Sequence, residues 1–172
     1  MSESAKIRLG EPVYRDAHHV LCVWENTLLT YSNAAPNLPY LKAWTQTVEL
    51  VAEQFAEGLL VMTIIDQHTR APDDNSKAHI RNTLIRYGAK IGAFAYVVEG
   101  EGFGAATLRS AISLISLAAR YPFPIKVFGH AADAAPWLLS RSRRTPLAED
   151  TIKLTTIATT LREARTPIPA TG

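Results

Sequence analysis

The sequence has few of the features that mark secreted, membrane or nucleic-acid-binding proteins. Its only cysteine, Cys22, lies in an apolar run, so a disulfide within the chain is excluded. Lys and Arg number 18 against 16 Asp and Glu, and a net charge of +2 does not favour nucleic acid as a partner. The N-terminal residues MSESAKIRLGEP contain no apolar core of a secretory signal, and no stretch reaches the roughly 18 apolar residues of a membrane span. We therefore predict a protein of the reducing cytoplasm, with no membrane span and no nucleic-acid partner.

The length and composition instead fit one folded domain. The chain has 172 residues, of which 47% are hydrophobic, and we find no internal repeat or low-complexity tract. Apolar periodicity and turn residues predict strands at 12–16, 19–25, 59–65, 93–98 and 124–128, and helices at 39–57, 76–90, 104–120 and 131–139. The order β-β-α-β-α-β-α-β-α predicts an α/β fold, a mixed sheet flanked by helices with an antiparallel entry strand.

The composition changes after Leu139, so we divide the chain into a domain at 11–140 and a C-terminal segment at 141–172. That segment begins with the basic stretch SRSRRTP, and Thr145 is predicted to cap an extra helix with Pro146 at its first position. The last seven residues, TPIPATG, are predicted to be disordered. One face of the extra helix is expected to carry Leu147, Leu154, Ile157 and Leu161.

The stretch VVEGEGFGAATLRS, residues 97–110, contains a glycine pattern that resembles a dinucleotide-binding loop. Gly100, Gly102 and Ala105 match G-x-G-x-x-G/A. However, this loop follows the fourth predicted strand rather than the first, and no acidic residue stands about twenty positions later. Glu99 and Glu101 also lie where the phosphates would bind. We therefore interpret the glycines as a tight turn into a helix whose end the glutamates neutralise, and predict no cofactor.

No pattern in the sequence requires catalysis or a metal. The acidic and histidine residues after the third predicted strand lack the spacing of a metal site, so we interpret them as solvated loop residues. Cys22 lies among apolar neighbours and is predicted to be an inert buried thiol. An enzyme that uses Asp66, His68 and Asp74 is therefore the least favoured reading. The acidic and histidine residues in question are Asp66, His68, Asp73, Asp74 and His79.

The predicted helix at 104–120 is apolar or small on almost every side. Arg109 and Arg120 are its only charged residues. Because a surface helix should have a wide polar face, three interpretations stay open: burial under the C-terminal helix, an interface with a second copy or partner, or a wall of an apolar ligand cavity. Leu108, Ile112 and Ile115 are the candidate interface residues.

The order of elements and the closing stretch IKVFGHAADAAPWL, which ends in the pair Trp137-Leu138, resemble the SpoIIAA-like branch of the STAS superfamily over residues 11–140. In the anti-sigma-factor antagonists of that superfamily, a strand that ends in Asp is followed about eight residues later by Asp-Ser-Ser/Thr-Gly, whose second hydroxyl residue is phosphorylated. Here Asp66 is followed by Asp74-Asn75-Ser76-Lys77. The resemblance places Ser76 at the phospho-acceptor position, with Lys77 in place of the family glycine; the alternative is that Ser76 only caps a helix.

The resemblance implies a non-enzymatic regulatory module that binds another protein. We expect the binding surface at the carboxyl edge of the sheet, with a possible homodimer through the helix at 104–120. The alternative function, by analogy with Sec14-type domains, is a carrier of a small apolar ligand or lipid. The residues expected at the partner-binding edge are Asp66, His68, Asp74, Asn75, Ser76, Lys77, Arg81, Gly102 and Phe103.

Overall fold

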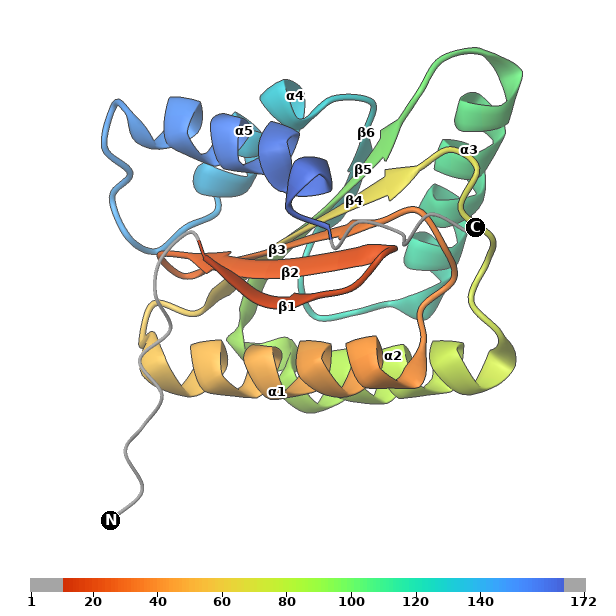
Figure 1. The fold of residues 1–172 in the computed structure, drawn as a ribbon. Coiled ribbons are helices and arrows are strands. Elements are labelled where there is room, and N and C mark those ends of the chain that lie inside the picture. Colours follow the sequence, from red (N-terminus) through yellow and green to blue (C-terminus); the bar gives the residue numbers. More distant parts are fainter. Residues whose placement is uncertain (1–10, 166–172) are drawn as a thin grey trace.

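Six strands form one sheet in the order of the sequence (Figure 1). The structure, a computed structural model, describes residues 11–165; the N-terminal residues 1–10 and the predicted disordered tail at 166–172 lie outside the described residues. The first three strands are antiparallel neighbours, and the third to the sixth run parallel, which confirms the predicted mixed sheet. The strands are β1 (Pro12–Arg15), β2 (His19–Trp24), β3 (Thr27–Ser32), β4 (Leu59–Asp66), β5 (Ile91–Glu99) and β6 (Ile125–Phe128).

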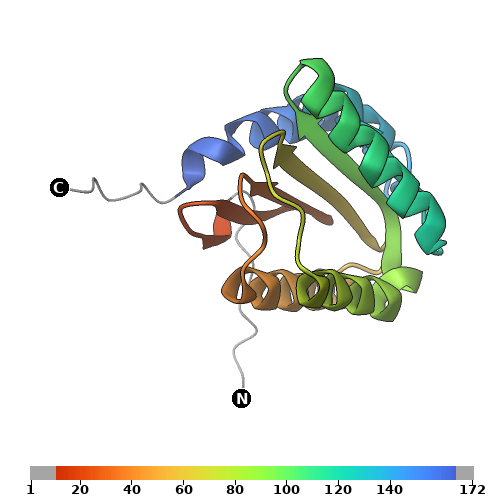
Figure 2. The same ribbon diagram turned by 90° about the vertical axis from the view of Figure 1, so that its right-hand side faces the viewer.

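The helices cover both faces of this sheet. α1, α2 and α3 each connect two neighbouring parallel strands, and right-handed crossovers place such helices on the same face. α1 and α2 lie side by side under that face, whereas α4 and α5 cover the opposite one (Figures 1 and 2). The helical segments are α1 (Leu38–Gln54), α2 (Asp74–Tyr87), α3 (Gly102–Ala119), α4 (Ala131–Leu139), α5 (Asp150–Thr160), and the 3₁₀ turns η1 (Gly88–Lys90) and η2 (Leu161–Ala164).

The central strand β4 shows why the sheet needs cover on both faces. Its side chains alternate between two hydrophobic clusters: Leu59 and Val61 pack toward α1 and α2, while Leu60 and Met62 pack toward α4 and α5. All four side chains are buried. The continuous apolar run of the sequence is thus explained by two-sided burial, as in other parallel sheets.

No strand is predicted between the strand at 19–25 and the helix at 39–57, and this is wrong, because the first part of that segment forms β3. The register pairs Trp24 with Thr27, so Glu25 and Asn26 make a two-residue hairpin turn without glycine or proline. Glu25 has a φ of 51°, and the Asn26 side-chain amide donates a 2.8 Å hydrogen bond to Gly58 O. A buried tertiary contact holds this turn, which is why local turn signals did not reveal it. The sheet therefore begins with three antiparallel strands instead of two.

The C-terminal helix begins later than predicted, because a buried carboxylate replaces the expected cap. Asp150 Oδ2 accepts hydrogen bonds from the Leu147 N–H (2.8 Å) and from Arg144 Nη2 (2.7 Å). Leu147 is 60% exposed, so its placement on the inner face is wrong, whereas Leu154 and Leu161 are buried. The latter two join the same core cluster as α4, so this segment packs on its own domain.

Candidate functional site

The carboxyl ends of the parallel strands place two predicted acidic positions together. Asp66 and Glu99 are partners in the β4–β5 register. Asp66 Oδ1 accepts a 2.8 Å hydrogen bond from the His68 N–H, which turns the chain at the end of β4. Glu99 forms an ion pair with Arg162 of η2. Glu99 therefore faces the C-terminal segment, and the expectation that it neutralises the start of α3 is wrong.

The loops that follow the strands contact one another at this edge. Thr69 Oγ1 donates a 3.1 Å hydrogen bond to Ser32 O, which joins the loop after β4 to the end of β3. The glycine turn after β5 lies directly against Gln67, because a Cβ atom built at Gly100 would come within 2.5 Å of the Gln67 side chain. These contacts make the three loops one continuous, mutually supported surface.

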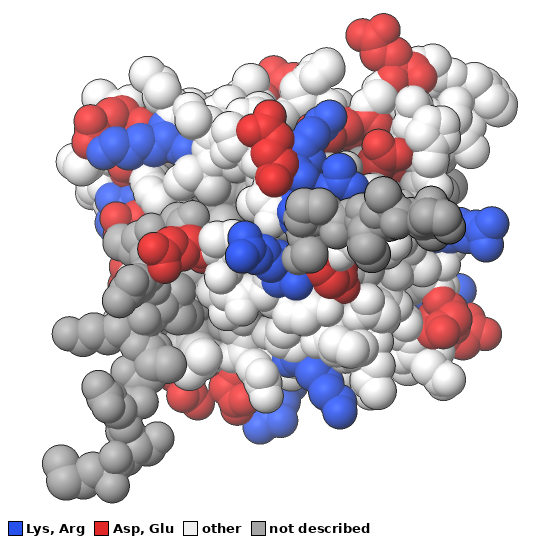
Figure 3. Space-filling view, viewed as in Figure 1, with Lys and Arg blue, Asp and Glu red and all other residues white. Residues whose placement is uncertain are grey.

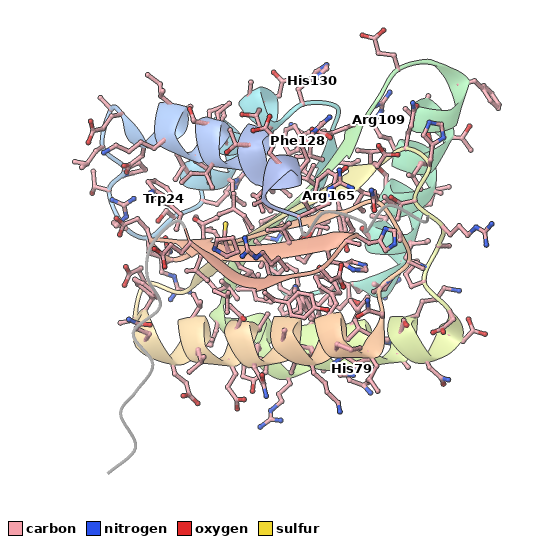
Figure 4. All side chains as sticks on the ribbon, in the orientation of Figure 1. Trp24, His79, Arg109, Phe128, His130 and Arg165 are labelled. Atoms are coloured by element: carbon pink, nitrogen blue, oxygen red, sulfur yellow. The ribbon has the colours of Figure 1, made fainter. Side chains whose placement is uncertain are left out.

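Arg109 of α3 holds the glycine turn in place (Figure 4). Its Nη1 donates to Val98 O at 3.1 Å and to Gly100 O at 3.4 Å. Gly100 and Gly102 have φ values of 113° and 82°, which only glycine adopts without strain. The guanidinium thus satisfies carbonyl groups within the protein itself, in agreement with a structural turn.

A glycine-to-alanine substitution tests this description of the turn. We expect Gly100→Ala to lower the free energy of unfolding by about 1–3 kcal/mol, since the new methyl group imposes backbone strain and collides with Gln67. The matched control is Gly104→Ala in the same segment, where a Cβ atom meets nothing within 4 Å and helix propensity predicts a gain of up to about 1 kcal/mol. Urea denaturation of the two variants measures both values. Equal effects of the two substitutions would contradict the proposed geometry.

Ser76 is not the cap of α2. Asp73 is the N-cap residue, and its Oδ1 accepts a 2.7 Å hydrogen bond from the Ser76 N–H. Hydrogen bonds from the backbone and side chain of Ser76 lower the pKa of Asp73. Ser76 is consequently the third helical residue and is only 7% exposed. Its predicted phosphorylation stays a prediction, and a kinase would need this helix end to open.

The predicted edge residues fall into two groups at opposite sides of the carboxyl edge. The start of α2 lies low in Figures 1 and 2 and the start of α3 lies high, because the loop at 67–73 crosses the edge before α2 begins. The expected partner-binding edge, which grouped Gly102 and Phe103 with Ser76, is therefore not one continuous patch. The first group, at the ends of β4 and β5, comprises Asp66, His68, Gly102 and Phe103; the second, at the start of α2, comprises Asp74, Asn75, Ser76, Lys77 and Arg81.

Phe103 is the most exposed large apolar side chain of this edge. It is 87% exposed and follows Gly102 at the start of α3. Glu101, Gly102 and Gly104, which flank it in the chain, are also exposed. A large aromatic side chain is therefore exposed next to the glycine turn that Arg109 and Gln67 contact.

Sequence reasoning missed a polar network at the β1–β2 turn. The carboxylate of Asp16 accepts hydrogen bonds from the His18 and His19 N–H groups (both 2.7 Å), Tyr14 Oη (2.8 Å) and Asn37 Nδ2 (3.0 Å). Burial alone would raise the pKa of Asp16, but these donors outweigh it and hold the pKa well below its ordinary value. The clustered polar residues at 16–19 were the available signal, but only the fold brings Asn37 to them.

His79 and Cys22 do not belong to a site at the carboxyl edge. His79 Nε2 lies 2.8 Å from Thr45 Oγ1 of α1, so this histidine links two helices instead of joining Asp66 and His68 (Figure 4). Cys22 is 2% exposed, and burial raises the pKa of its thiol to about 12. Within residues 11–165, no three His, Cys, Asp or Glu side chains converge as metal ligands would.

α3 is largely uncovered. Ala105 is its only buried residue, Leu108 and Ile112 are half-buried, and Ile115 is 67% exposed. Since α5 packs on α4, burial of α3 under the C-terminal helix is wrong. The 18 residues of α3 are also long and apolar enough for a membrane span by length and composition alone, which the sequence prediction did not recognise. Both ends of α3 are joined to paired strands of the same sheet.

Comparisons with known proteins identify the fold. No protein-family profile matches the sequence, and no curated protein matches it. A solved structure of an uncharacterised protein from Shewanella loihica, of the DUF3478 family and described as having a SpoIIAA-like fold, superposes with a TM-score of 0.53 and 13% sequence identity. The match covers 70% of this chain and 93% of that protein. The six-stranded mixed sheet and the helices around it are therefore a SpoIIAA-like fold.

Proposed function

We propose that this protein is a non-enzymatic regulatory module of the cytoplasm that binds another protein through the turn around Phe103. The observation that carries the proposal is the 87% exposure of Phe103 on a supported turn. Protein interfaces obtain most of their affinity from a few such aromatic side chains, which insert into a pocket of the partner. The SpoIIAA-like neighbour supports the fold of the module and is itself uncharacterised.

The rigidity of the turn favours binding. Arg109 fixes the carbonyl groups of Val98 and Gly100, and Gln67 fills the space behind Gly100. A turn that is ordered before binding loses little conformational freedom when a partner arrives. The same contacts position Phe103 relative to the loop at 67–73.

Exposed polar side chains lie on the turn of Phe103 and on the neighbouring loop, where they could form the rim of an interface. Glu101 precedes it on the same turn, and His68 and Arg70 are exposed on the neighbouring loop. On the face shown in Figure 3, acidic and basic side chains are interspersed, and acidic side chains stand at the tip above the start of α3 with uncharged residues beside them. An apolar centre with a mixed polar rim is typical of surfaces that bind proteins.

The start of α2 is a second part of the proposed surface only if its helix end opens. Lys77 pairs with Asp74 at 3.0 Å on the exposed side of this helix, while Ser76 faces inward. Regulation by phosphorylation of Ser76 therefore remains a prediction from the resemblance to anti-sigma-factor antagonists. The alternative function, a carrier of an apolar ligand or lipid, likewise stays a prediction.

The experiment that tests the proposal compares two substitutions of exposed apolar side chains, one on the turn and one on α5. Tagged protein is used to capture partners from the source cells, and each captured protein is quantified by mass spectrometry. We expect Phe103→Asp to reduce capture of a specific partner at least about tenfold, because it removes the apolar anchor. Ile152→Asp serves as the control, since Ile152 of α5 is also apolar and 71% exposed but lies away from the turn and from α3. A partner that Phe103→Asp retains as well as the control does would refute the proposed surface.

A further inference from the structure

We propose that the open edge of β6 binds an extended peptide as an added strand, with acidic and apolar side chains alternating along that peptide. This surface is separate from the turn around Phe103 and goes beyond the proposed function. It rests on three observations at β6: unpaired backbone groups, a groove along the strand, and cations without carboxylate partners.

The backbone of β6 is open on one side. Within residues 11–165, β6 is the last strand of the sheet and pairs only with β5. Pro124 O accepts a 3.0 Å hydrogen bond from the Phe94 N–H, and in a parallel ladder the groups that face the neighbouring strand belong to every second residue. The N–H and C=O groups of Ile125 and Val127 therefore point away from β5. An added strand would pair with these four groups.

A groove of about 590 Å³ follows this edge. Three consecutive β6 residues, Ile125 to Val127, line it, and because their side chains alternate between the two faces, the groove must run along the strand edge. Its far wall is the C-terminal half of α3 with the turn that follows. This volume lies within the range of binding pockets for small molecules and side chains. The other lining residues are Ser113, Ser116, Leu117, Arg120, Tyr121 and Phe123, so the part of the chain that the structure describes contributes no carboxylate to the groove.

Cations stacked on aromatic rings flank the same strand. Lys126 Nζ lies 5.1 Å from the centre of the Phe128 ring, which packs at 5.5 Å against Trp137, and the guanidinium of Arg141 lies 5.7 Å from the Trp137 ring (Figure 4 labels Phe128). Lys126 and Arg141 are exposed. Within residues 11–165, neither cation has a carboxylate within 4.0 Å. Acidic side chains of a bound peptide would supply the missing charge.

The charge at β6 distinguishes a peptide from a second copy of this chain. If two β6 strands paired about a two-fold axis, each would bring Lys126 toward the other, and a lysine on an edge strand opposes such pairing. An acidic peptide instead gains from the same lysine. The apolar side chains of the peptide would enter the groove between β6 and α3, beside Leu117 and Val127.

The first test uses two pools of acetylated nine-residue peptides, with Val, Leu or Ile at even positions. One pool has Glu at every odd position, and the other has Lys. We expect the Glu pool to bind the full-length protein at least about tenfold more tightly, and Lys126→Glu to abolish that preference. The matched control is Lys42→Glu on the exposed side of α1. Equal retention of both pools, retention of neither, or unchanged binding by Lys126→Glu would overturn the proposal.

A second variant tests the backbone pairing. Val127→Pro removes an N–H group that faces away from β5, and edge strands tolerate proline at such positions. We expect it to reduce binding of the Glu pool at least about tenfold while the thermal midpoint stays within a few degrees of the wild-type value. Binding that survives Val127→Pro would overturn strand addition. A dimer of the wild-type protein that this substitution dissociates would show that a second copy occupies the edge instead.

Discussion

Replacing Leu154 with alanine is expected to lower the free energy of unfolding by about 2–5 kcal/mol. Leu154 is completely buried and belongs to the cluster that α5 shares with α4 and the sheet. Truncation removes its contacts with that cluster and leaves a cavity that the rigid sheet cannot close. The effect would be this large only if the C-terminal segment is part of the domain core.

Ile152→Ala in the same helix is the control for this prediction. Ile152 is 71% exposed, so its truncation is expected to change the stability by less than about 0.5 kcal/mol. Chemical denaturation followed by circular dichroism measures both variants. If Leu154→Ala were as mild as Ile152→Ala, α5 would not pack on α4 as described.

Replacing Asp16 with alanine is expected to cost about 2–4 kcal/mol at neutral pH, because several donors lose a charged acceptor together. His19 is affected most, since it is 1% exposed, its Nδ1 lies 3.0 Å from Asp16 Oδ1, and its ring stacks on Tyr40 at 4.5 Å. The control is Asp133→Ala in α4, where the carboxylate is exposed. If Asp16→Ala lowered the free energy of unfolding no more than Asp133→Ala does, the network around Asp16 would not stabilise the fold.

The pH dependence of stability also tests whether the charged carboxylate of Asp16 stabilises the fold. Asp16 has an ordinary pKa of 3.8, and hydrogen bonds lower it in the folded protein. The contribution of Asp16 to the free energy of unfolding is therefore complete above its ordinary pKa. It is lost as the pH falls toward the lower pKa that Asp16 has in the folded protein. The stability difference between wild type and Asp16→Asn should shrink between about pH 5 and pH 2. A difference that stayed constant over that range would show that the charge of Asp16 does not stabilise the fold.

The central strands and α1 could be predicted from periodicity, because each of them buries a continuous face or both faces. β4 and β5 are apolar over most of their length and end in Asp66 and Glu99, and α1 carries buried residues at helical spacing, including Trp44 and Val48. β3 was not predicted, because the turn before it has no glycine or proline and depends on the hydrogen bond from Asn26 to Gly58. That contact joins residues far apart in the sequence, which no local pattern can show.

The candidate site could be predicted only in part, because local patterns show turns but not contacts between distant parts of the chain. The glycines at 100 and 102 marked a turn into a helix, and the structure contains that turn. However, the roles of Arg109 and Arg162 depend on which loops the fold brings together, and sequence patterning did not reveal them. The separation of α2 from the glycine turn likewise follows from the path of the loop at 67–73, whose direction the sequence leaves open.

Much of the surface of α3 is apolar and is not covered by other helices. Leu114 and Leu117 are 68% and 78% exposed, and the groove along β6 opens beside the same helix. Contiguous apolar patches on the surface of a folded domain mark sites of contact with other molecules. The predicted homodimer through α3 would cover these side chains, and it remains a prediction that sedimentation in solution can measure.

Crosslinking from the position of Phe103 tests directly whether the turn around this residue binds another protein. A photoreactive phenylalanine analogue is introduced at Phe103, and in a second variant at Lys42 on the exposed side of α1. The account predicts that irradiation of living cells joins the first variant to a specific second protein, whereas the Lys42 variant gives no such product. If the product were absent at Phe103, or equally abundant at Lys42, the proposed protein-binding turn would be contradicted.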